Sequence, residues 1–232
     1  QALAEIIDRQ DAEGATPAAV YAPAAAPRDA AVITVTANGL GTDLRNTGQS
    51  VTVIERDEIE QLQGADPARA LNRVPGLSLS RSGGIGRVTS VNLRGASSDQ
   101  VLVLIDGVRV ADQASPSGGF DFGNLLLGTA GKIDVLRGSN STIWGSEAVG
   151  GVIDISTRTD RGLSGSIEYG ARDTVFASAA AGAGNDRVFF GLTGSWYETD
   201  GFSAAASGTE ADGSQQFALG TTAFVNLTPS LE

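Results

Sequence analysis

The sequence predicts an α+β domain followed by antiparallel β-strands of a transmembrane β-barrel that is incomplete within these residues. Helix and strand signals are mixed between residues 50 and 160. From residue 161 onwards, stretches of about ten residues alternate between apolar and small polar side chains, which is the length and period of membrane-crossing strands. About four such stretches are present, whereas the smallest barrels need about eight strands, so we expect further strands beyond Glu232.

The composition argues against a nucleic-acid-binding protein and against most enzymes. The 232 residues carry a net charge of −11, whereas a nucleic-acid-binding protein needs clustered Lys and Arg to neutralise phosphates. The chain contains no histidine and no cysteine, which removes the usual nucleophile–base systems and thiolate or histidine metal sites. A hydrolase on a β-scaffold would lack its usual general base, so we expect no enzymatic activity. No apolar run reaches the roughly 18 residues of a transmembrane helix.

Four segments of different composition divide the chain. Residues 1–30 form an N-terminal segment with an Ala/Pro-rich, flexible linker. Residues 31–49 hold a β-branched run and a polar connection, residues 50–160 form the α+β domain, and residues 161–232 hold the first barrel strands. The β-branched run favours extended structure. It could be an edge strand of the next domain or an exposed strand that pairs with the sheet edge of a partner.

Within the α+β domain, local signals predict two short helices and several strands. Asp66 can cap a helix that has Pro67 at its first position and runs to Val74. Asp106-Gly107 predicts a tight turn between two strands of a hairpin. The other helix is predicted at residues 56–63, and strands are predicted at residues 51–54, 88–94, 101–105, 108–110, 132–136 and 151–157.

The stretches after residue 161 separate their side chains onto two faces. A soluble β-sandwich also alternates, but its strands are usually nearer five or six residues and carry more Lys and Glu on the polar face. Here the polar face is Gly, Ser and Thr with few charges, as a hydrated barrel interior requires. In the three stretches with the clearest alternation, the apolar face includes Leu163, Ile167, Tyr169, Val188, Phe190, Leu192, Trp196, Phe217, Leu219, Ala223 and Val225.

Several motifs, in order, resemble the plug domain of TonB-dependent outer-membrane receptors, and the vitamin B12 receptor branch in particular. They are ALNRVPGLS at residues 70–78, VNLRG at 91–95, VLVLIDGVR at 101–109, KIDVLRG at 132–138 and IWGSEAVGGVIDIS at 143–156. The resemblance implies a 22-stranded barrel with the plug in its lumen, of which this chain holds the plug and the first strands. It also implies TonB-dependent transport of a bulky ligand, either cobalamin or a ferric siderophore. The location would be the outer membrane of a Gram-negative bacterium, in contact with its lipid, and no cofactor would be required.

The resemblance places the TonB box on the β-branched run. The partner would be the C-terminal domain of TonB, which pairs with an extended strand through backbone hydrogen bonds and therefore tolerates sequence variation. The predicted partner-binding residues are Val32, Ile33, Thr34, Val35, Thr36 and Ala37.

Two plug loops, residues 81–87 and 111–120, are expected to face outward and meet the ligand. Glycines allow close approach of the backbone, and arginines can hydrogen-bond carbonyl, phosphate or carboxylate groups. The alternative is that these loops merely pack under the barrel mouth. The predicted ligand-binding residues are Arg81, Ser82, Gly83, Gly84, Arg87, Ser115 and Ser117.

Two further pairs of residues follow from the resemblance. Arg94 and Arg137 are expected to form ion pairs with acidic groups of the plug or the barrel wall, or else to be ordinary surface arginines at strand ends. Glu210 and Asp212 stand where the vitamin B12 branch has an extracellular calcium loop. Ser203 stands where that branch has a further Asp, and Ca²⁺ needs about six to eight oxygen ligands, so a solvated acidic loop is the alternative.

Transport is not the only function that the residues allow. The alternative is a soluble plug-type module from a truncated receptor, which binds a ligand or a protein without a barrel. The sequence does not specify the ligand.

Overall fold

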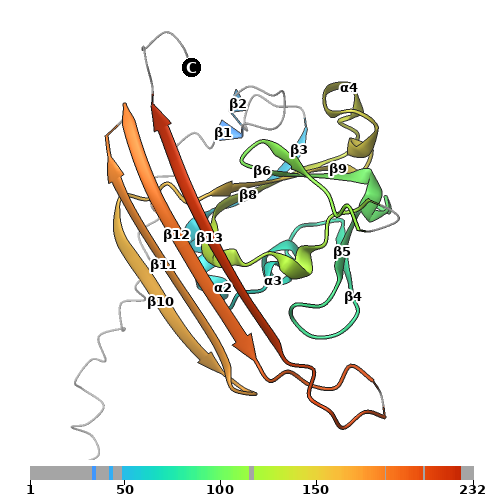
Figure 1. Cartoon of the computed structure of the whole chain (residues 1–232). Helices are drawn as coiled ribbons and strands as arrows, with labels where there is room; N and C mark the ends of the chain where they lie inside the picture. Colours follow the sequence, from blue (N-terminus) through green and yellow to red (C-terminus); the bar gives the residue numbers. More distant parts are fainter. Residues whose placement is uncertain are drawn as a thin grey trace, which may run out of the picture. The chain divides into compact units, whose positions relative to one another are not determined.

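The computed structural model describes residues 33–34, 42–43, 49–114, 118–185, 187–205 and 207–225. Strands β1 (Ile33–Thr34) and β2 (Thr42–Asp43) form a two-residue antiparallel pair. The other described elements make up a mixed domain with two sheets and a separate four-stranded sheet (Figure 1). No helix in the described part of the chain is long and apolar enough to cross a membrane.

The centre of the α+β domain is a five-stranded sheet in the order β3-β8-β9-β6-β7. Strands β6 and β9 run parallel, and the other neighbouring strands are antiparallel. The predicted turn at Asp106-Gly107 is confirmed, because it joins β6 to β7 with positive φ angles at both residues. The strands are β3 (Ser50–Ile54), β6 (Val101–Ile105), β7 (Val108–Val110), β8 (Ala130–Arg137) and β9 (Gly151–Thr157).

Helices and a long hairpin cover this sheet. The predicted cap is confirmed, because the Asp66 carboxylate accepts a hydrogen bond of 2.9 Å from the Ala68 amide and Pro67 opens α3. The prediction that this helix reaches Val74 is wrong: α3 ends at Leu71, and turns lead to Pro75. The remaining elements are α2 (Arg56–Leu62), α3 (Pro67–Leu71), α4 (Ser141–Trp144), β4 (Leu77–Arg81), β5 (Thr89–Leu93), and the 3₁₀ turns η2 (Ser98–Gln100), η3 (Phe122–Asn124), η4 (Leu127–Thr129) and η5 (Ser146–Ala148).

The α+β domain has its own hydrophobic core. One face of the sheet packs against α2, α3 and the β4–β5 hairpin, and the opposite face packs on a smaller cluster beneath α4. The burial of large aliphatic side chains contributes about 1.5–3 kcal/mol each. The larger cluster includes Ile54, Ile59, Leu71, Leu93, Val103, Phe122, Ile133, Val135 and Ile153.

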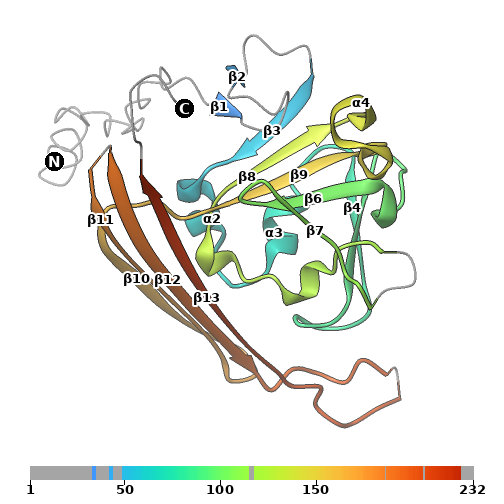
Figure 2. The ribbon, with the colours of Figure 1, turned by 45° about the horizontal axis from the view of Figure 1, so that its top comes forward.

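The second sheet, which we call the wall sheet, consists of four long antiparallel strands in sequence order. They are β10 (Gly162–Gly170), β11 (Thr174–Gly184), β12 (Val188–Thr199) and β13 (Ser214–Val225). The connections between the first three strands are short in sequence, and the connection between β12 and β13, residues 200–213, is longer. Figure 2 shows the four strands side by side and tilted as one layer. Among the described residues β10 and β13 do not pair with each other, so the sheet is not closed.

The alternation predicted for the wall sheet is confirmed. On β12, burial alternates residue by residue, with Phe189, Thr193, Ser195 and Tyr197 buried on one face. The other face carries exposed apolar side chains, including Leu163 at 86% and Phe217 at 78% exposure. The buried face is the one that contacts the α+β domain, as the contacts below show.

Candidate functional site

The contact between the α+β domain and the wall sheet is built from small side chains. Gly128 in η4 lies against Ser178 of β11 and Ser195 of β12. A Cβ atom at position 128 would stand 2.6 Å from the Ser195 Cβ and 3.0 Å from the Ser178 Cβ. Real Cβ atoms do not approach so closely, so glycine at this position allows the domain to sit directly on the wall.

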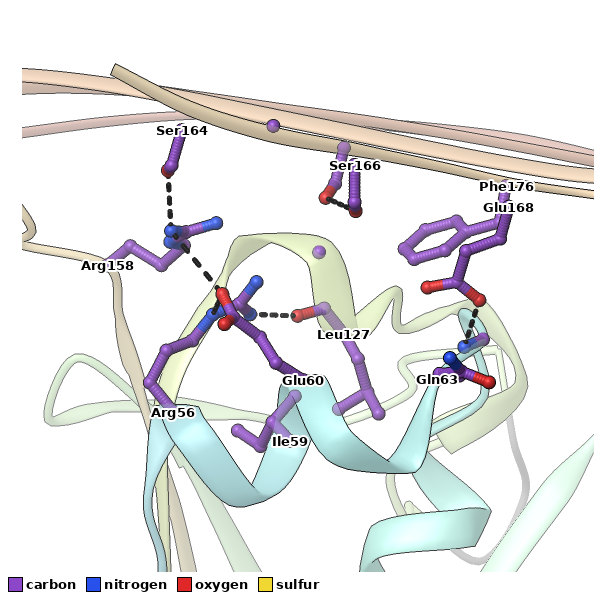
Figure 3. Close-up of a pocket in the computed structure, with 14 residues that line it drawn as sticks. Arg56, Ile59, Glu60, Gln63, Leu127, Arg158, Ser164, Ser166, Glu168 and Phe176 are labelled. Carbon is purple, nitrogen blue, oxygen red and sulfur yellow. Dashed lines mark hydrogen bonds and ion pairs between the residues drawn. The ribbon is translucent and has the colours of Figure 1, made fainter. Parts of the chain in front are cut away.

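A group of charged side chains lies where β9 leads into β10, and Figure 3 shows most of it. We call Arg56, Glu60, Arg158, Asp160 and Ser164 the junction cluster. Arg158 has only 4% of its side chain exposed, and it donates to Asp160 Oδ2 and to Ser164 Oγ, each at 2.8 Å. Its guanidinium also lies 3.9 Å from Glu60 Oε1, which Arg56 Nε contacts at 2.9 Å.

The junction cluster joins elements that are distant in the sequence. Arg56 on α2 donates to the carbonyl oxygens of Leu127 at 3.2 Å and Ala130 at 2.9 Å. The backbone amide of Arg158 donates to the Thr129 carbonyl at 3.2 Å. Helix α2, the η4 turn, the end of β9 and the start of β10 are thereby fastened together.

A cavity of about 250 Å³ lies between α2 and the inner face of the wall sheet (Figure 3). At one end it is bordered by the junction cluster. At the other end, Glu168 of β10 accepts a 2.7 Å hydrogen bond from the Gly64 amide, just after the end of α2. Gln63 adopts a positive φ of 51° there. The middle of the cavity is lined by Gly128, Gly165, Ser166 and Ser178, so polar and small groups surround a space that can hold water.

The β4–β5 hairpin is anchored by a bidentate ion pair at the point where its strands lead into the connecting loop. Arg81 donates to both Asp66 carboxylate oxygens at 2.6 and 2.8 Å, and its Nε donates to Thr89 Oγ1 at 2.9 Å. The side-chain hydrogen bond to Asp66 is the main cause that raises the pKa of Arg81 above its ordinary value. This arginine, predicted to bind ligand, therefore connects the hairpin to the first turn of α3; a ligand-binding role stays a prediction.

The tip of the same hairpin lies against the loop between β12 and β13. Arg87 Nη2 contacts Asp212 Oδ1 at 3.0 Å, and the other Asp212 oxygen accepts from the Ala204 amide at 2.7 Å. Position 84 faces Phe202, and a Cβ at Gly86 would overlap the Ser214 hydroxyl. The hairpin tip and this wall loop therefore form one surface.

Comparisons with known proteins identify this arrangement. Residues 43–152 match the family model described as the TonB-dependent Receptor Plug Domain. Residues 43–152 form a TonB-dependent receptor plug domain. The residues that form the five-stranded sheet and its helices are thus the plug, and the strands that follow match the receptors' wall strands.

Two curated relatives are vitamin B12 transporters named BtuB. The protein from Vibrio vulnificus is 36% identical over 176 residues, which are 73% of this chain and 28% of that protein. The protein from Photobacterium profundum is 34% identical over 179 residues, 77% of this chain and 27% of that protein. The chain therefore spans little more than a quarter of the length of these relatives. They are transporters, which agrees with the expectation that the family is not enzymatic.

Solved structures share the fold at lower identity. The alcaligin outer-membrane receptor FauA from Bordetella pertussis superposes with a TM-score of 0.66 and 22% identity, over 85% of this chain and 32% of that chain. The ferripyoverdine receptor of Pseudomonas aeruginosa gives a TM-score of 0.58 and 18% identity, over 73% of this chain and 23% of that chain. The predicted fold class, a plug followed by antiparallel wall strands, is confirmed.

The two loops predicted to face outward contain the predicted ligand-binding residues. Ser82 is exposed, and its hydroxyl lies 3.5 Å from the Val88 carbonyl oxygen. Gly83 and Gly84 are half-buried against the wall loop. Ser115 and Ser117 lie outside the described residues. Contact of these residues with a ligand stays a prediction.

The predicted calcium ligands do not come together as a metal site. Asp212 is engaged by Arg87, and a Glu210 oxygen accepts from the Thr209 amide at 3.1 Å. No group of three or more carboxylates that could hold a metal ion occurs among the residues that the structure describes. A calcium ion needs about six to eight oxygen ligands. The described residues do not fit a calcium site, and no step of the function is assigned to a metal.

Arg94 and Arg137, predicted to form ion pairs, approach the same turn of the plug. The Arg94 amide donates to the Gly76 carbonyl at 2.7 Å, and Arg137 Nη1 donates to the Pro75 carbonyl at 3.3 Å. The Arg137 Nε is buried without a hydrogen-bond acceptor among the described atoms. Within the described ranges neither arginine contacts a carboxylate; a partner outside these ranges stays a prediction.

Only two residues of the predicted TonB box are described. Ile33 pairs with Asp43 and Thr34 with Thr42 in an antiparallel register, so these two residues are extended, as predicted. Val32, Val35, Thr36 and Ala37 lie outside the described residues. The contact with TonB stays a prediction.

The sequence analysis missed several charged residues that the structure brings together. Asp134 and Asp154 lie directly opposite each other on β8 and β9, with 1% and 4% exposure. Burial, followed by the charge of Asp134, raises the pKa of Asp154 to about 6, and burial also raises the pKa of Asp134. Lys132 contacts Asp134 at 2.8 Å.

The sequence analysis also missed Glu168. It is the single acidic residue on the polar face of β10, and its isolation among Gly and Ser could have revealed it.

Proposed function

We propose that this chain forms the gated entrance of an outer-membrane transporter for a scarce, bulky ligand. One observation carries the proposal: the wall sheet has two opposite faces, and the plug occupies the polar one. The apolar face is unpartnered by any described residue, and its side chains belong to strands long enough to cross a bilayer. A plug on the polar face of such strands closes the space that a solute would cross.

The exposed face of the wall sheet suits contact with outer-membrane lipid. Its large apolar side chains would be costly to leave in water, because each buried CH₂ group is worth about 0.8 kcal/mol. In a membrane they would face hydrocarbon, with backbone groups satisfied by neighbouring strands. They include Leu163, Ile167, Tyr169, Val188, Phe190, Leu192, Trp196, Phe217 and Leu219.

The plug–wall contact suits a gate that opens and recloses. Among the described residues it is made of small side chains, the Thr157–Thr222 hydroxyl pair at 2.9 Å, and a limited set of ion pairs, with a small shared apolar cluster around Phe176 and Tyr197. Hydrogen bonds of this kind contribute about 0.5–1.5 kcal/mol each and exchange readily with water. A gate of this composition can separate without exposing a large apolar core.

Energy for opening would come from the TonB C-terminal domain, acting on residues 32–37. The described part of this run, Ile33–Thr34, is extended and pairs with β2 in a two-residue ladder, and strand addition uses the same extended form. The ligand would meet the outer plug loops, where Ser82, Gly83, Gly84 and Arg87 lie. The names of the relatives support two ligand classes, cobalamin and ferric siderophores.

Ligand uptake by the receptor that carries this chain tests the proposal. Val35→Pro removes a backbone donor and blocks strand pairing in the box. Val20→Pro, placed in the Ala/Pro-rich segment outside the box, is the matched control. We expect uptake of cobalamin or a ferric siderophore to fall about tenfold or more in the first variant and to be unchanged in the second. Undiminished uptake with Val35→Pro would contradict TonB coupling through this segment.

A soluble binding module is a second candidate, because the larger hydrophobic cluster lies wholly within the plug. The discriminating experiment is to purify residues 40–160 and ask two questions: whether they fold in water, and whether they bind cobalamin or a ferric siderophore. Folding with micromolar or tighter binding would favour the module, whereas folding without binding would favour the gate.

A further inference from the structure

The plug is fastened to the wall sheet by charged side chains at two places, which differ in the burial of the arginine. One is the junction cluster, where β9 leads into β10. The other is at the opposite end of the wall strands, where the hairpin tip meets the loop of residues 200–213. Between them Gly128 lies against Ser195.

The junction cluster is built around a buried guanidinium. Arg158 has 4% exposure, although the Glu60 and Asp160 side chains are 53% and 49% exposed, and its guanidinium has partners on the β9–β10 connection, on β10 and on α2. Removing these partners leaves the guanidinium charge without compensation in a poorly solvated place, which is strongly unfavourable. The structure therefore opposes separation at this end.

The attachment at the other end is accessible to solvent. The Arg87 and Asp212 side chains are 45% and 28% exposed, and a single contact of 3.0 Å joins them. Exposed ion pairs are weak and are screened by salt. Gln216 adds one hydrogen bond of 2.9 Å to the Gly123 carbonyl, and Ser214 fits beneath Gly86, which has no side chain. This end can open at low cost.

We propose that Arg158 is the pivot of the plug and that the Arg87–Asp212 pair is a latch. When the latch opens, the hairpin tip leaves β13 while the junction cluster and the Gly128 contact stay in place. An anionic group that binds Arg87 would take the place of Asp212, so occupation of the hairpin tip and opening of the latch would be linked. Arg158 is thus a positioning residue, because it acts by holding the connection between plug and wall.

Only the biological role of this motion rests on the proposed gating function; the pivot and the latch are inferred from the contacts themselves. The two attachments can be measured in the chain itself, without ligand or TonB. A failed uptake experiment would overturn the proposed function and leave the pivot and latch standing. Conversely, labelling rates that contradict the pivot and latch would leave the proposed function standing.

The absence of cysteine from the chain makes single thiols unambiguous probes. Ser214→Cys places a thiol under Gly86 at the latch. Ser195→Cys places a thiol beside Gly128, at a position that is 7% exposed. The rate of reaction with N-ethylmaleimide, measured on the folded chain in detergent micelles, reports how often each contact opens. The reagent is uncharged, so salt does not alter its approach.

At the latch we expect Asp212→Asn to accelerate labelling of the thiol at position 214 about threefold or more, since the amide cannot accept from Arg87 while it serves the Ala204 amide. Raising NaCl from 0.1 to 1 M shortens the screening length from about 10 to 3 Å and is expected to have the same effect. Labelling at position 195 should change less than twofold. Arg109→Gln, which removes an exposed pair with Glu147 away from the wall, is the matched control and should change neither rate.

At the pivot we expect Arg158→Gln to accelerate labelling at position 195 about tenfold or more. If that variant does not fold, judged by far-ultraviolet circular dichroism, Asp160→Asn and Ser164→Ala each remove one partner of Arg158 and are expected to act in the same direction. Equal acceleration at positions 195 and 214 by Asp212→Asn would overturn the proposal, because the plug would then separate as a whole. Unchanged labelling at position 195 in the folded Arg158 and partner variants would also overturn it.

Discussion

Gly128 of the plug and Ser195 of the wall are in contact so close that any side chain at position 128 would force one of them to shift. An added Cβ would lie 2.6 Å from the Ser195 Cβ. The backbone at position 128 does not have a positive φ. The restriction is therefore steric: it comes from the neighbouring Ser195 and not from the backbone conformation of residue 128.

Gly128→Ala should weaken the plug–wall contact through overpacking, with a loss of about 1–3 kcal/mol in the free energy of unfolding measured by urea denaturation. The double variant Gly128→Ala/Ser195→Gly removes the atom that the new methyl meets, so it should recover at least half of that loss. Gly170→Ala, whose Cβ would find only ordinary contacts, is the control and should stay within about 0.5 kcal/mol. No recovery in the double variant would refute the steric account.

Arg81 and Arg87 should behave differently although they lie in the same hairpin. Arg81→Gln breaks a bidentate pair whose Asp66 carboxylate is almost buried, and we expect it to lower the free energy of unfolding by about 3–5 kcal/mol. Arg87→Gln breaks an exposed pair and should cost at most about 1 kcal/mol. Urea denaturation of both variants under the same conditions gives the comparison. Equal losses in the free energy of unfolding would contradict the expectation that the more buried Arg81–Asp66 pair stabilises the fold more than the Arg87–Asp212 pair.

Asp154 should make the plug less stable as the pH rises through the mildly acidic range. Its pKa is raised from an ordinary 3.8 to about 6 in the folded chain, so between these values the folded state binds more protons than the unfolded state. The free energy of unfolding therefore falls from about pH 4 to pH 6 and then levels off, by about 2–3 kcal/mol in total.

Asp154→Asn tests this pH dependence. The amide oxygen can still accept the hydrogen bond from the Gly107 backbone, and the side chain no longer ionises. We expect greater stability than the parent at pH 7 and a flatter profile between pH 4 and 6, in urea denaturation at several pH values. Asp99→Asn, at an exposed position, is the control and should leave the profile unchanged. A parent profile that rises from pH 4 to 6 would contradict the assigned direction of the pKa shift.

Glu168 should stabilise the end of α2 from across the plug–wall contact. Glu168→Ala leaves the Gly64 amide without its carboxylate acceptor, and hydrogen bonds to charged groups are worth about 1.5–3 kcal/mol. Hydrogen exchange at Gly64, followed by NMR, should accelerate about tenfold or more in this variant and less in Glu168→Gln, which keeps an acceptor. Glu198→Ala removes a carboxylate from the exposed face of β12 and should leave the exchange rate unchanged.

Much of the local structure could be predicted because it depends on neighbouring residues. Strict alternation placed Leu163 and Phe217 on one face of the wall sheet, and Asp66 followed by Pro67 marked the start of α3. The end of that helix was predicted three residues too late, since the competition between a further helical turn and the turn before Pro75 depends on packing. The ordered motifs were enough to indicate the family.

By itself, the sequence determined which strands form, which faces of the wall sheet are apolar and to which family the plug domain belongs. Only the tertiary structure decided the partners of the charges: Arg81 with Asp66, Arg87 with Asp212, and Asp134 opposite Asp154. The physical reason is the range of the two effects. Side-chain periodicity acts between residues close in the sequence, whereas an ion pair depends on distance in space, and Arg87 and Asp212 are 125 positions apart.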